Sequence, residues 1–137
     1  MKKTILWLAI ACGTVICSCT KDSEADVTAI LSGTWILSEV GVDYNGNSRV
    51  DNGETTPASA TILYDTLTFT KDDTFTSHYN DGRGDSMKSG TYSYSNNRIY
   101  FVTSSSSNDD YIPLTSISQN QFVYNIAGAW HIYSKLR

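Results

Sequence analysis

The sequence predicts an all-β protein, an eight-stranded antiparallel up-and-down barrel, with a two-sheet sandwich as the alternative. Apolar and polar residues alternate with a period of two along most of the chain, which is typical of strands with one buried face. Short turn-forming segments separate these stretches, so consecutive strands are expected to be antiparallel neighbours. No helical periodicity is long enough to cover a sheet, and pairing the first strand with the last would remove both sheet edges.

The predicted strands follow one another from residue 34 to residue 136. They cover residues 34–42, 62–70, 74–79, 90–94, 98–103, 111–118, 121–126 and 130–136. Four connections, at residues 71–73, 95–97, 118–120 and 127–129, are short and carry Asp, Asn, Gln or Gly, as tight hairpin turns commonly do. A short turn is expected at residues 27–31, just before the first strand.

The alternation also predicts which side chains face the barrel interior. The expected inward residues are Trp35, Leu37, Glu39, Leu67, Phe69, Phe75, Ser77, Tyr79, Tyr92, Tyr94, Ile99, Phe101, Ile112, Leu114, Phe122, Tyr124, Ile132 and Leu136. From this set the predicted ligand-binding residues are Leu37, Glu39, Leu67, Phe69, Phe75, Ser77, Tyr79, Tyr92, Tyr94 and Phe101. Glu39 and Asp65 are two inward carboxylates, each of which either orients a polar group of the ligand or pairs with a tyrosine hydroxyl.

The N-terminal segment is organised like a secretory signal. Two lysines precede an apolar run over residues 5–16, which is too short to span a bilayer as a stable helix. Ile16 lies three residues before Cys19, and Ser18 lies directly before it, an arrangement that resembles the lipobox of bacterial lipoproteins. The resemblance implies that the chain is cut before Cys19 and that this cysteine carries the lipid.

The expected domain organisation follows from this resemblance. Residues 1–18 are a signal peptide of the lipoprotein type, residues 19–26 are the lipidated cysteine and a flexible tether, and residues 27–137 are the barrel. The implied location is the bacterial cell envelope, anchored to a membrane by lipid, at the outer membrane and on either its periplasmic or its surface face. The protein partner, if there is one, is not predicted.

Composition excludes several classes of function. All three cysteines lie at or before position 19, so the barrel is expected to have neither a disulfide nor a thiolate metal site. Fourteen acidic residues against ten basic residues give a net charge of −4, and no basic stripe is present. An acidic chain of this kind is not expected to bind nucleic acid.

The first predicted strand carries a G-x-W at residues 33–35, which resembles the first signature of the lipocalins. The G-T-Y at residues 90–92 and the I-Y-S-K at residues 132–135 are similar to the short lipocalin-like domains of lipoproteins from diderm bacteria. The resemblance implies that Trp35 closes the bottom of the barrel. It also implies that a cation near the end of the last strand packs across this ring, namely Arg137 or, failing that, Lys135. A long first connection is implied as a lid over the open end.

That connection covers residues 43–61, and its first part, DYNGNSRVDNGE at residues 43–54, also has the spacing of a twelve-residue calcium loop. The oxygen ligands would come from Asp43, Asn45, Asn47, Arg49 through its carbonyl, Asp51 and Glu54. Against calcium, Ser48 stands where glycine normally allows the sharp turn, and no helices flank the loop. Two interpretations remain open: a weak calcium site that stiffens the loop, or a long connection without metal. No other cofactor is expected.

The predicted function is binding of a small, partly apolar ligand inside the barrel. The alternative is a filled-core structural or protein-binding module of an envelope complex, which acts through its loops. An enzyme is not expected, because His78 and His131 have neither a nucleophile nor metal-ligand spacing beside them. The R-G-D at residues 83–85 reads as an integrin-recognition tripeptide or as an ordinary polar turn. The polar stretch at residues 103–110 is expected to rim the mouth of the barrel.

Overall fold

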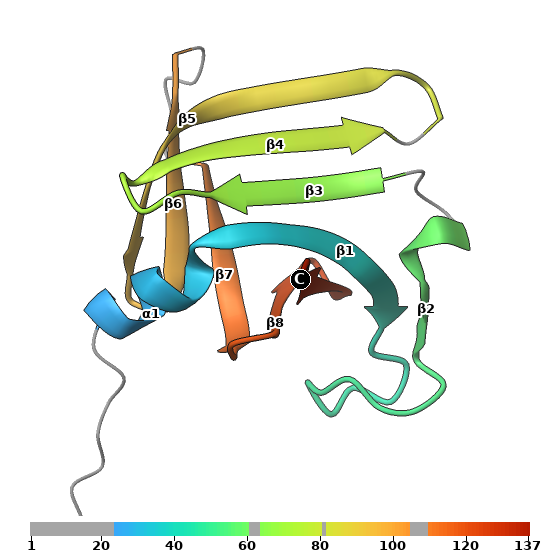
Figure 1. The fold of residues 1–137 in the computed structure, drawn as a ribbon. Coiled ribbons are helices and arrows are strands. Elements are labelled where there is room, and N and C mark those ends of the chain that lie inside the picture. The colour runs from blue at the N-terminus through green and yellow to red at the C-terminus, as the bar shows by residue number, and fades with distance from the viewer. Residues whose placement is uncertain (1–23, 61–63, 81, 105–109) are drawn as a thin grey trace, which may run out of the picture.

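The computed structural model describes residues 24–60, 64–80, 82–104 and 110–137, which form a closed antiparallel β-barrel (Figure 1). The barrel strands are β1 (Gly33–Val42), β3 (Tyr64–Phe69), β4 (Thr74–Asn80), β5 (Asp85–Ser95), β6 (Arg98–Thr103), β7 (Asp110–Ile117), β8 (Gln121–Ile126) and β9 (Ala129–Lys135). Consecutive barrel strands pair with one another, and β1 also pairs with β9, which closes the barrel. The predicted eight-stranded barrel is therefore confirmed, and the sandwich alternative is wrong.

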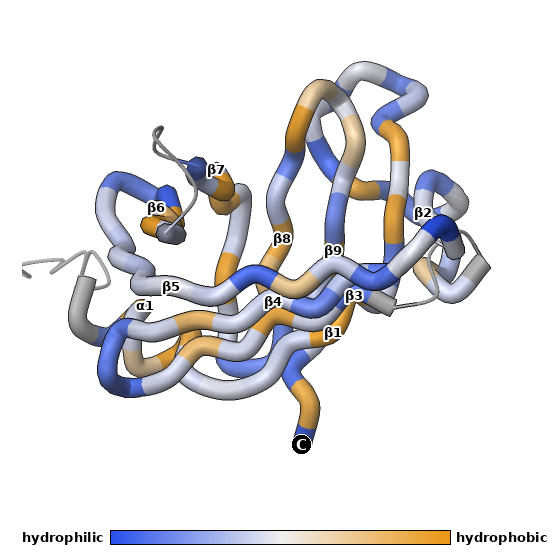
Figure 2. Tube along the Cα trace, turned by 90° about the horizontal axis from the view of Figure 1, so that it is seen from above, coloured by the Kyte–Doolittle hydropathy of each residue, from blue (hydrophilic) through white to orange (hydrophobic). Residues whose placement is uncertain are grey.

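The turn chemistry explains why neighbouring strands fold back on one another. Asn96 and Asn97, between β5 and β6, have φ values of 50° and 57°. Ala127 and Gly128, between β8 and β9, have φ values of 54° and 86°. Two consecutive positive φ angles are what a type I′ hairpin turn requires, and such turns match the right-handed twist of the strands they join. Along the strands, hydrophobic and hydrophilic positions interleave (Figure 2).

Three elements differ from the predicted ones. A helix, α1 (Glu24–Leu31), replaces the expected turn and begins within the predicted tether. A short strand, β2 (Thr55–Pro57), and a 3-10 turn, η1 (Ala58–Ala60), lie in the long first connection. β3 pairs with β1 only as far as Ile36. Beyond that point, β2 pairs with the same edge of β1. Among the described residues no helix is long and apolar enough to cross a membrane.

One end of the barrel is packed solid, and α1 lies across it. Val27 and Leu31 of the helix belong to the same buried cluster as Trp35, which is fully buried. The indole Nε1 of Trp35 donates a hydrogen bond to the carbonyl oxygen of Leu31, at 2.6 Å. The other strands contribute Phe69, Phe75, Tyr92, Ile99, Leu114, Phe122 and Tyr133 to this core. The bond to Leu31 satisfies one of the carbonyls that the end of a helix leaves free.

The cation that packs on Trp35 is Lys135, so the primary expectation of Arg137 is wrong. Lys135 Nζ lies 4.9 Å from the ring centroid of Trp35 and donates a hydrogen bond to the carbonyl oxygen of Ile30, at 2.7 Å. Lys135 is the register partner of Trp35 and the last residue of β9, whereas Arg137 lies beyond the strand and is exposed. Gly33 has φ +132°, and a Cβ there would lie 2.7 Å from Cε of Lys135. The glycine of the G-x-W therefore leaves room for the lysine stem.

A β-bulge in β1 changes the direction of Glu39. The register with β9 runs from Leu37 opposite Tyr133 directly to Glu39 opposite Ile132, so Ser38 is the extra residue. The Ser38 hydroxyl donates to the carbonyl oxygen of Ile132, at 2.9 Å. A bulge reverses the inward and outward alternation beyond it. Glu39 therefore shares the outward face of Ile132, and the expectation of an inward Glu39 is wrong.

A second, smaller cluster lies on this outward face. Val123, Trp130 and Ile132 are buried together, and Val50 of the long loop packs against them. Val123 stands between Phe122 and Tyr124, which belong to the main core, so the alternation places it outside.

This outer cluster corrects two expectations. The inward residues of β9 are His131, Tyr133 and Lys135, not Ile132 and Leu136, since Leu136 lies beyond the strand and is exposed. The long loop packs on the outside of the barrel through Val50, and none of its described residues lines the barrel cavity, so the expectation of a lid over the mouth is wrong. The apolar faces of Trp130 and Ile132 are the surface that the loop buries.

Candidate ligand-binding cavity

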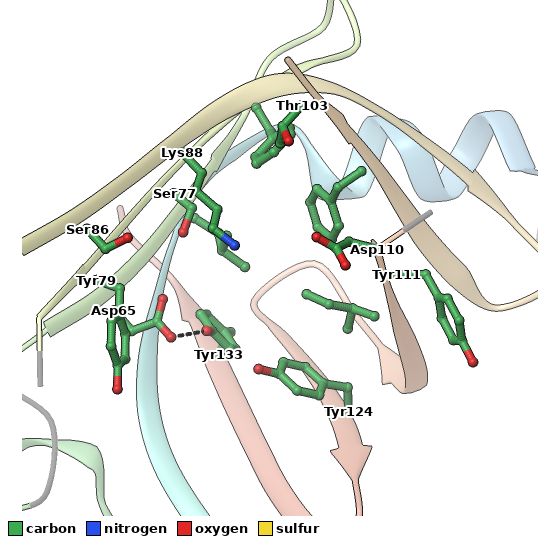
Figure 3. Close-up of a pocket in the computed structure, with 14 residues that line it drawn as sticks. Asp65, Ser77, Tyr79, Ser86, Lys88, Thr103, Asp110, Tyr111, Tyr124 and Tyr133 are labelled. Carbon is green, nitrogen blue, oxygen red and sulfur yellow. Dashed lines mark hydrogen bonds between the residues drawn. The ribbon is translucent and has the colours of Figure 1, made fainter. Parts of the chain in front are cut away.

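The end of the barrel opposite α1 holds a cavity of about 470 Å³ (Figure 3). All barrel strands except β1 contribute to its wall. The lining residues are Asp65, Leu67, Phe75, Ser77, Tyr79, Ser86, Lys88, Phe101, Thr103, Asp110, Tyr111, Ile112, Tyr124 and Tyr133. This volume lies in the range of sites that hold a small organic molecule, roughly 300–1,000 Å³.

The inner part of the wall is apolar and continues into the packed core. Phe75 of β4 and Phe101 of β6 meet edge to face, with their ring centroids 4.6 Å apart. Leu67 is buried beside them, and Ile112 of β7 packs against the same core. Because each of these side chains is also held by the packed end, this part of the cavity is rigid and preformed.

A partly buried acid lies on the wall of the cavity. The hydroxyl of Tyr133 donates to Oδ2 of Asp65, at 2.6 Å, which joins β9 to the start of β3 (Figure 3). Burial raises the pKa of Asp65, while the bond from Tyr133 and the charge of His131 act in the opposite direction. Burial raises the pKa of Tyr133 well above its ordinary value of 10.0, so this residue stays a neutral donor.

Two further aromatic rings, those of Tyr124 and His131, lie near Asp65 and Tyr133. Tyr124 stacks on His131 with ring centroids 4.6 Å apart and an interplanar angle of 7°. Burial raises the pKa of Tyr124 to about 12. Burial lowers the pKa of His131, partly opposed by the backbone of Ala129 and by Asp65. At neutral pH both rings are therefore uncharged, and the charges in the cavity wall are those of Asp65, Lys88 and Asp110.

The mouth is polar. Ser86 and Lys88 project from the start of β5, Thr103 ends β6 and Asp110 begins β7. In the described part of the chain, Lys88 and Asp110 form no ion pair with Asp65 or with each other. Of the polar stretch expected to rim the mouth, residues 105–109 lie outside the described residues, while Thr103 and Asp110 at its two ends do line the cavity.

The structure places the ten predicted ligand-binding residues in three locations. Leu67, Phe75, Ser77, Tyr79 and Phe101 line the cavity. Leu37, Phe69 and Tyr92 are buried in the packed half, and Tyr94 packs against it. Glu39 lies on the outward face. The inward phase of β3 to β6 was predicted correctly, but the cavity occupies only the half of the barrel that is away from α1.

Sequence reasoning missed several lining residues. Ser86 and Lys88 were missed because β5 begins five residues before its predicted start. Tyr133 was missed because the phase of β9 was inverted. Asp65 was predicted to point inward and either to orient a polar group of the ligand or to pair with a tyrosine hydroxyl, and the structure shows the bond from Tyr133. The tyrosine pairing is confirmed, and a role in orienting a ligand stays a prediction.

The loop at residues 43–54 is held by its own hydrogen bonds. The Asp43 carboxylate accepts hydrogen bonds from the backbone N–H groups of Gly46, Asn47 and Ser48. Ser48 makes the sharp turn with φ 60° although it is not glycine. The side-chain amides of Asn45 and Asn47 both donate to Asp51 Oδ2, at 2.8 and 2.6 Å, and these bonds lower the pKa of Asp51.

Glu54 completes this loop, because its carboxylate accepts hydrogen bonds from the backbone N–H groups of Tyr44 and Asp51. The backbone N–H of Arg49, whose carbonyl was also a predicted ligand, donates to Asn47 Oδ1 at 2.8 Å. Among the described residues no group of three or more His, Cys, Asp or Glu side chains is placed to hold a metal ion. Calcium binding by this loop stays a prediction.

The remaining predicted sites lie elsewhere. Cys19 and residues 1–18 are outside the described residues. The R-G-D sequence lies at the hairpin between β4 and β5, where Asp85 accepts a hydrogen bond from the side-chain amide of Asn80. A role in adhesion stays a hypothesis.

A closed up-and-down barrel with a tryptophan and a lysine at a helix-covered end and a cavity at the other defines a lipocalin-type protein. The chain belongs to the family of lipocalin-like domains, whose family model matches residues 31–124. A comparison with curated proteins finds no match.

Two solved structures share the fold. A lipocalin-like protein from Bacteroides uniformis ATCC 8492 is 16% identical, with a TM-score of 0.50 over 78% of this chain and 99% of that chain. A protein from Bacteroides eggerthii DSM 20697 is 14% identical, with a TM-score of 0.50 over 77% of this chain and 99% of that chain. At these identities the likeness concerns the fold alone.

Proposed function

We propose that this protein is a lipid-anchored, extracytoplasmic lipocalin-like protein that binds a small, partly apolar ligand in its barrel. The observation that carries the proposal is the cavity of about 470 Å³, in which an apolar inner wall meets several hydroxyls and one partly buried carboxylate. Concave, mostly preformed sites with a few converging polar groups are where proteins hold small molecules. Membership of the lipocalin-like family supports the same function. In this proposal the protein binds its ligand without transforming it.

The anchoring part of the proposal rests on the lipobox resemblance at residues 16–19. Each buried CH₂ of an acyl chain contributes about 0.8 kcal/mol of membrane affinity, so several chains on Cys19 would hold the protein durably. Replacing Cys19 by alanine should abolish incorporation of labelled fatty acid. Separation of inner and outer membranes then tests the location, and protease treatment of intact cells distinguishes the periplasmic from the surface face. Full labelling of the Cys19→Ala variant would contradict the anchor.

The ligand part is tested on protein purified from its own host. Native mass spectrometry and organic extraction should show a reproducible small molecule bound to the wild type. Ser77→Phe places a ring in the cavity and should abolish this co-purification, because Ser77 lines the wall. Thr76→Phe is the matched control, since Thr76 is the neighbouring residue on the exposed face of β4. Both variants are compared by thermal unfolding to confirm that they fold.

The alternative module that acts through its loops predicts a different result. No molecule would then co-purify, and Ser77→Phe would leave the cellular function of the protein unchanged. Substitutions in the loops would instead impair it.

A further inference from the structure

We propose that the ligand is an amphiphilic amine, whose ammonium group pairs with Asp65 and whose apolar body lies against Phe75 and Phe101. This inference rests on the proposed function, namely that the cavity binds a small ligand. It adds the charge and the orientation of that ligand.

Asp65 provides a preoriented but incompletely satisfied acceptor. Its Oδ2 accepts the hydroxyl of Tyr133 at 2.6 Å, and this bond fixes the direction of the carboxylate toward the cavity (Figure 3). A carboxylate has about four acceptor positions, and a single neutral donor occupies one of them. The described residues give this carboxylate no ion pair. A partly buried charge of this kind is stabilised most by an opposite charge with hydrogen-bond donors, which an ammonium group supplies.

The surrounding charges favour a cation over an anion. Two carboxylates, Asp65 and Asp110, and one ammonium group, Lys88, line the cavity. Lys88 lies on an exposed part of β5, where water screens its charge, whereas Asp65 is partly buried. The chain as a whole carries a net charge of −4, which also attracts a cation.

The apolar wall fixes the other end of the ligand. Phe75 and Phe101 are 4% and 8% exposed and meet edge to face, so they form a fixed aromatic surface rather than a mobile one. Hydroxyls of Ser77 and Tyr79 lie on the same wall. A molecule with one cationic end and a compact apolar or aromatic body matches this division between an acidic and an aromatic part.

The test compares three probes of similar shape: phenethylamine, phenylacetate and phenethyl alcohol. Each is titrated calorimetrically into the full chain reconstituted in lipid discs, with empty discs as the reference. Phenethylamine is expected to bind at least about tenfold more tightly than the other two, as a hydrogen-bonded charge pair implies. Asp65→Asn should remove this preference, because asparagine keeps the shape and still accepts the hydroxyl of Tyr133 but carries no charge.

Glu39→Gln is the matched control. It removes the same charge from the outward face, so the preference for phenethylamine should persist. Thermal unfolding confirms that each variant folds. Equal binding of all three probes, or an unchanged preference in Asp65→Asn, would overturn the amine while the proposed binding function stands. Preferred binding of phenylacetate would overturn it too and would assign the charge to Lys88. If no probe binds and no host molecule co-purifies, both proposals fail; if only the probes fail, the amine alone is overturned.

Discussion

Lys135 joins three elements at the packed end of the barrel. It contacts Trp35 of β1, bonds to the carbonyl oxygen of Ile30 in α1 and ends β9. A cation over an aromatic ring and a charged hydrogen bond each contribute of the order of 1 kcal/mol at a partly exposed site. Lys135 therefore holds the helix against the barrel as well as closing it.

Replacing Lys135 by methionine tests this role. The variant keeps most of the apolar stem, so the loss of about 1–2 kcal/mol in the free energy of unfolding reports on the charge. Arg137→Met is the matched control, because Arg137 is exposed and lies beyond β9, and it should change stability by less than about 0.5 kcal/mol. Denaturant unfolding measures both. A larger loss for Arg137→Met would contradict the assignment of Lys135.

Asp65 should make the stability of the fold depend on pH. Burial raises its pKa above the ordinary 3.8, so between 3.8 and the raised value the folded protein binds more protons than the unfolded chain. Stability therefore falls as pH rises through this window. The lowered pKa of His131 acts in the opposite sense, since stability falls as pH drops below its ordinary 6.5.

We expect Asp65→Asn to remove the fall in stability that begins above pH 3.8 and to leave the His131 effect in place. At neutral pH the variant should be more stable than the wild type, because the cost of burying the charge is gone. Urea unfolding over a series of pH values provides the measurement. The stability of the wild type could instead rise with pH in this window. If Asp65→Asn abolished that rise, the result would contradict the burial of the charge.

For single residues, the sequence predicted hydrogen-bond partners better than it predicted the face of the sheet on which a side chain lies. The pairing of Asp65 with a tyrosine hydroxyl follows from an inward acid among tyrosines. The direction of Glu39 did not follow, because the bulge at Ser38 leaves no mark in the pattern of apolar residues. The choice between Arg137 and Lys135 depended on where β9 ends, and strand ends are uncertain by about two residues.

Among the elements, the connection between β1 and β2 is held by close backbone contact. A Cβ at Gly41 would lie 2.7 Å from the carbonyl oxygen of Glu54, which accepts a hydrogen bond from the backbone N–H of Val42. The absence of a side chain at Gly41 therefore lets the end of the loop pack on β1. Val50 then reaches Trp130 in the outer cluster.

Gly41→Ala should displace this loop and destabilise the protein by about 1–3 kcal/mol, as overpacking of a tight contact does. The displacement can be separated from other effects by a double-mutant cycle with Val50→Ala. If Gly41→Ala already removes Val50 from Trp130, the second substitution should cost little more. Unfolding free energies of the two single variants and the double variant give the coupling. Fully additive costs would show that Gly41 does not hold the loop in place.

Calcium tests the other interpretation of the same loop. A calcium site predicts binding heat and a higher melting temperature at roughly 10⁻³ M calcium, the range of weak extracellular sites. A connection held only by hydrogen bonds from Asp43, Asp51 and Glu54 predicts neither. Calorimetric titration of the wild type and of Asp51→Asn distinguishes the two, since the calcium interpretation requires the response to weaken in the variant.

All eight barrel strands could be predicted from their alternation because each has one face in the core. The start of β5 could not, since four of residues 85–89 are polar and the fifth, Met87, is exposed. Its inward residues, Ser86 and Lys88, line an open cavity rather than a core. The helix α1 and the short strand β2 were missed because each has few residues in contact with the barrel. The loop was expected over the mouth, but the apolar outer face of β8 and β9 binds it instead.

For the whole molecule, the closure of the barrel could be predicted from the sequence, but the cavity could not. Eight consecutive strands with no covering helix have to close to remove their edges. Whether the interior is full depends on whether opposite side chains meet, and the same inward tyrosines and phenylalanines occur in both halves of this barrel. The helix and Trp35 fill one half, so the cavity remains only at the other.

The most direct test of ligand binding in the barrel cavity is an isoleucine-methyl NMR titration of the full chain in lipid discs with phenethylamine. Ile112 lines the cavity, whereas Ile132 lies on the outward face. A ligand held in the cavity should shift the methyl signal of Ile112 and leave that of Ile132 in place. Saturable shifts at Ile132 without any at Ile112 would place binding outside the barrel and contradict the assignment of the cavity as the binding site.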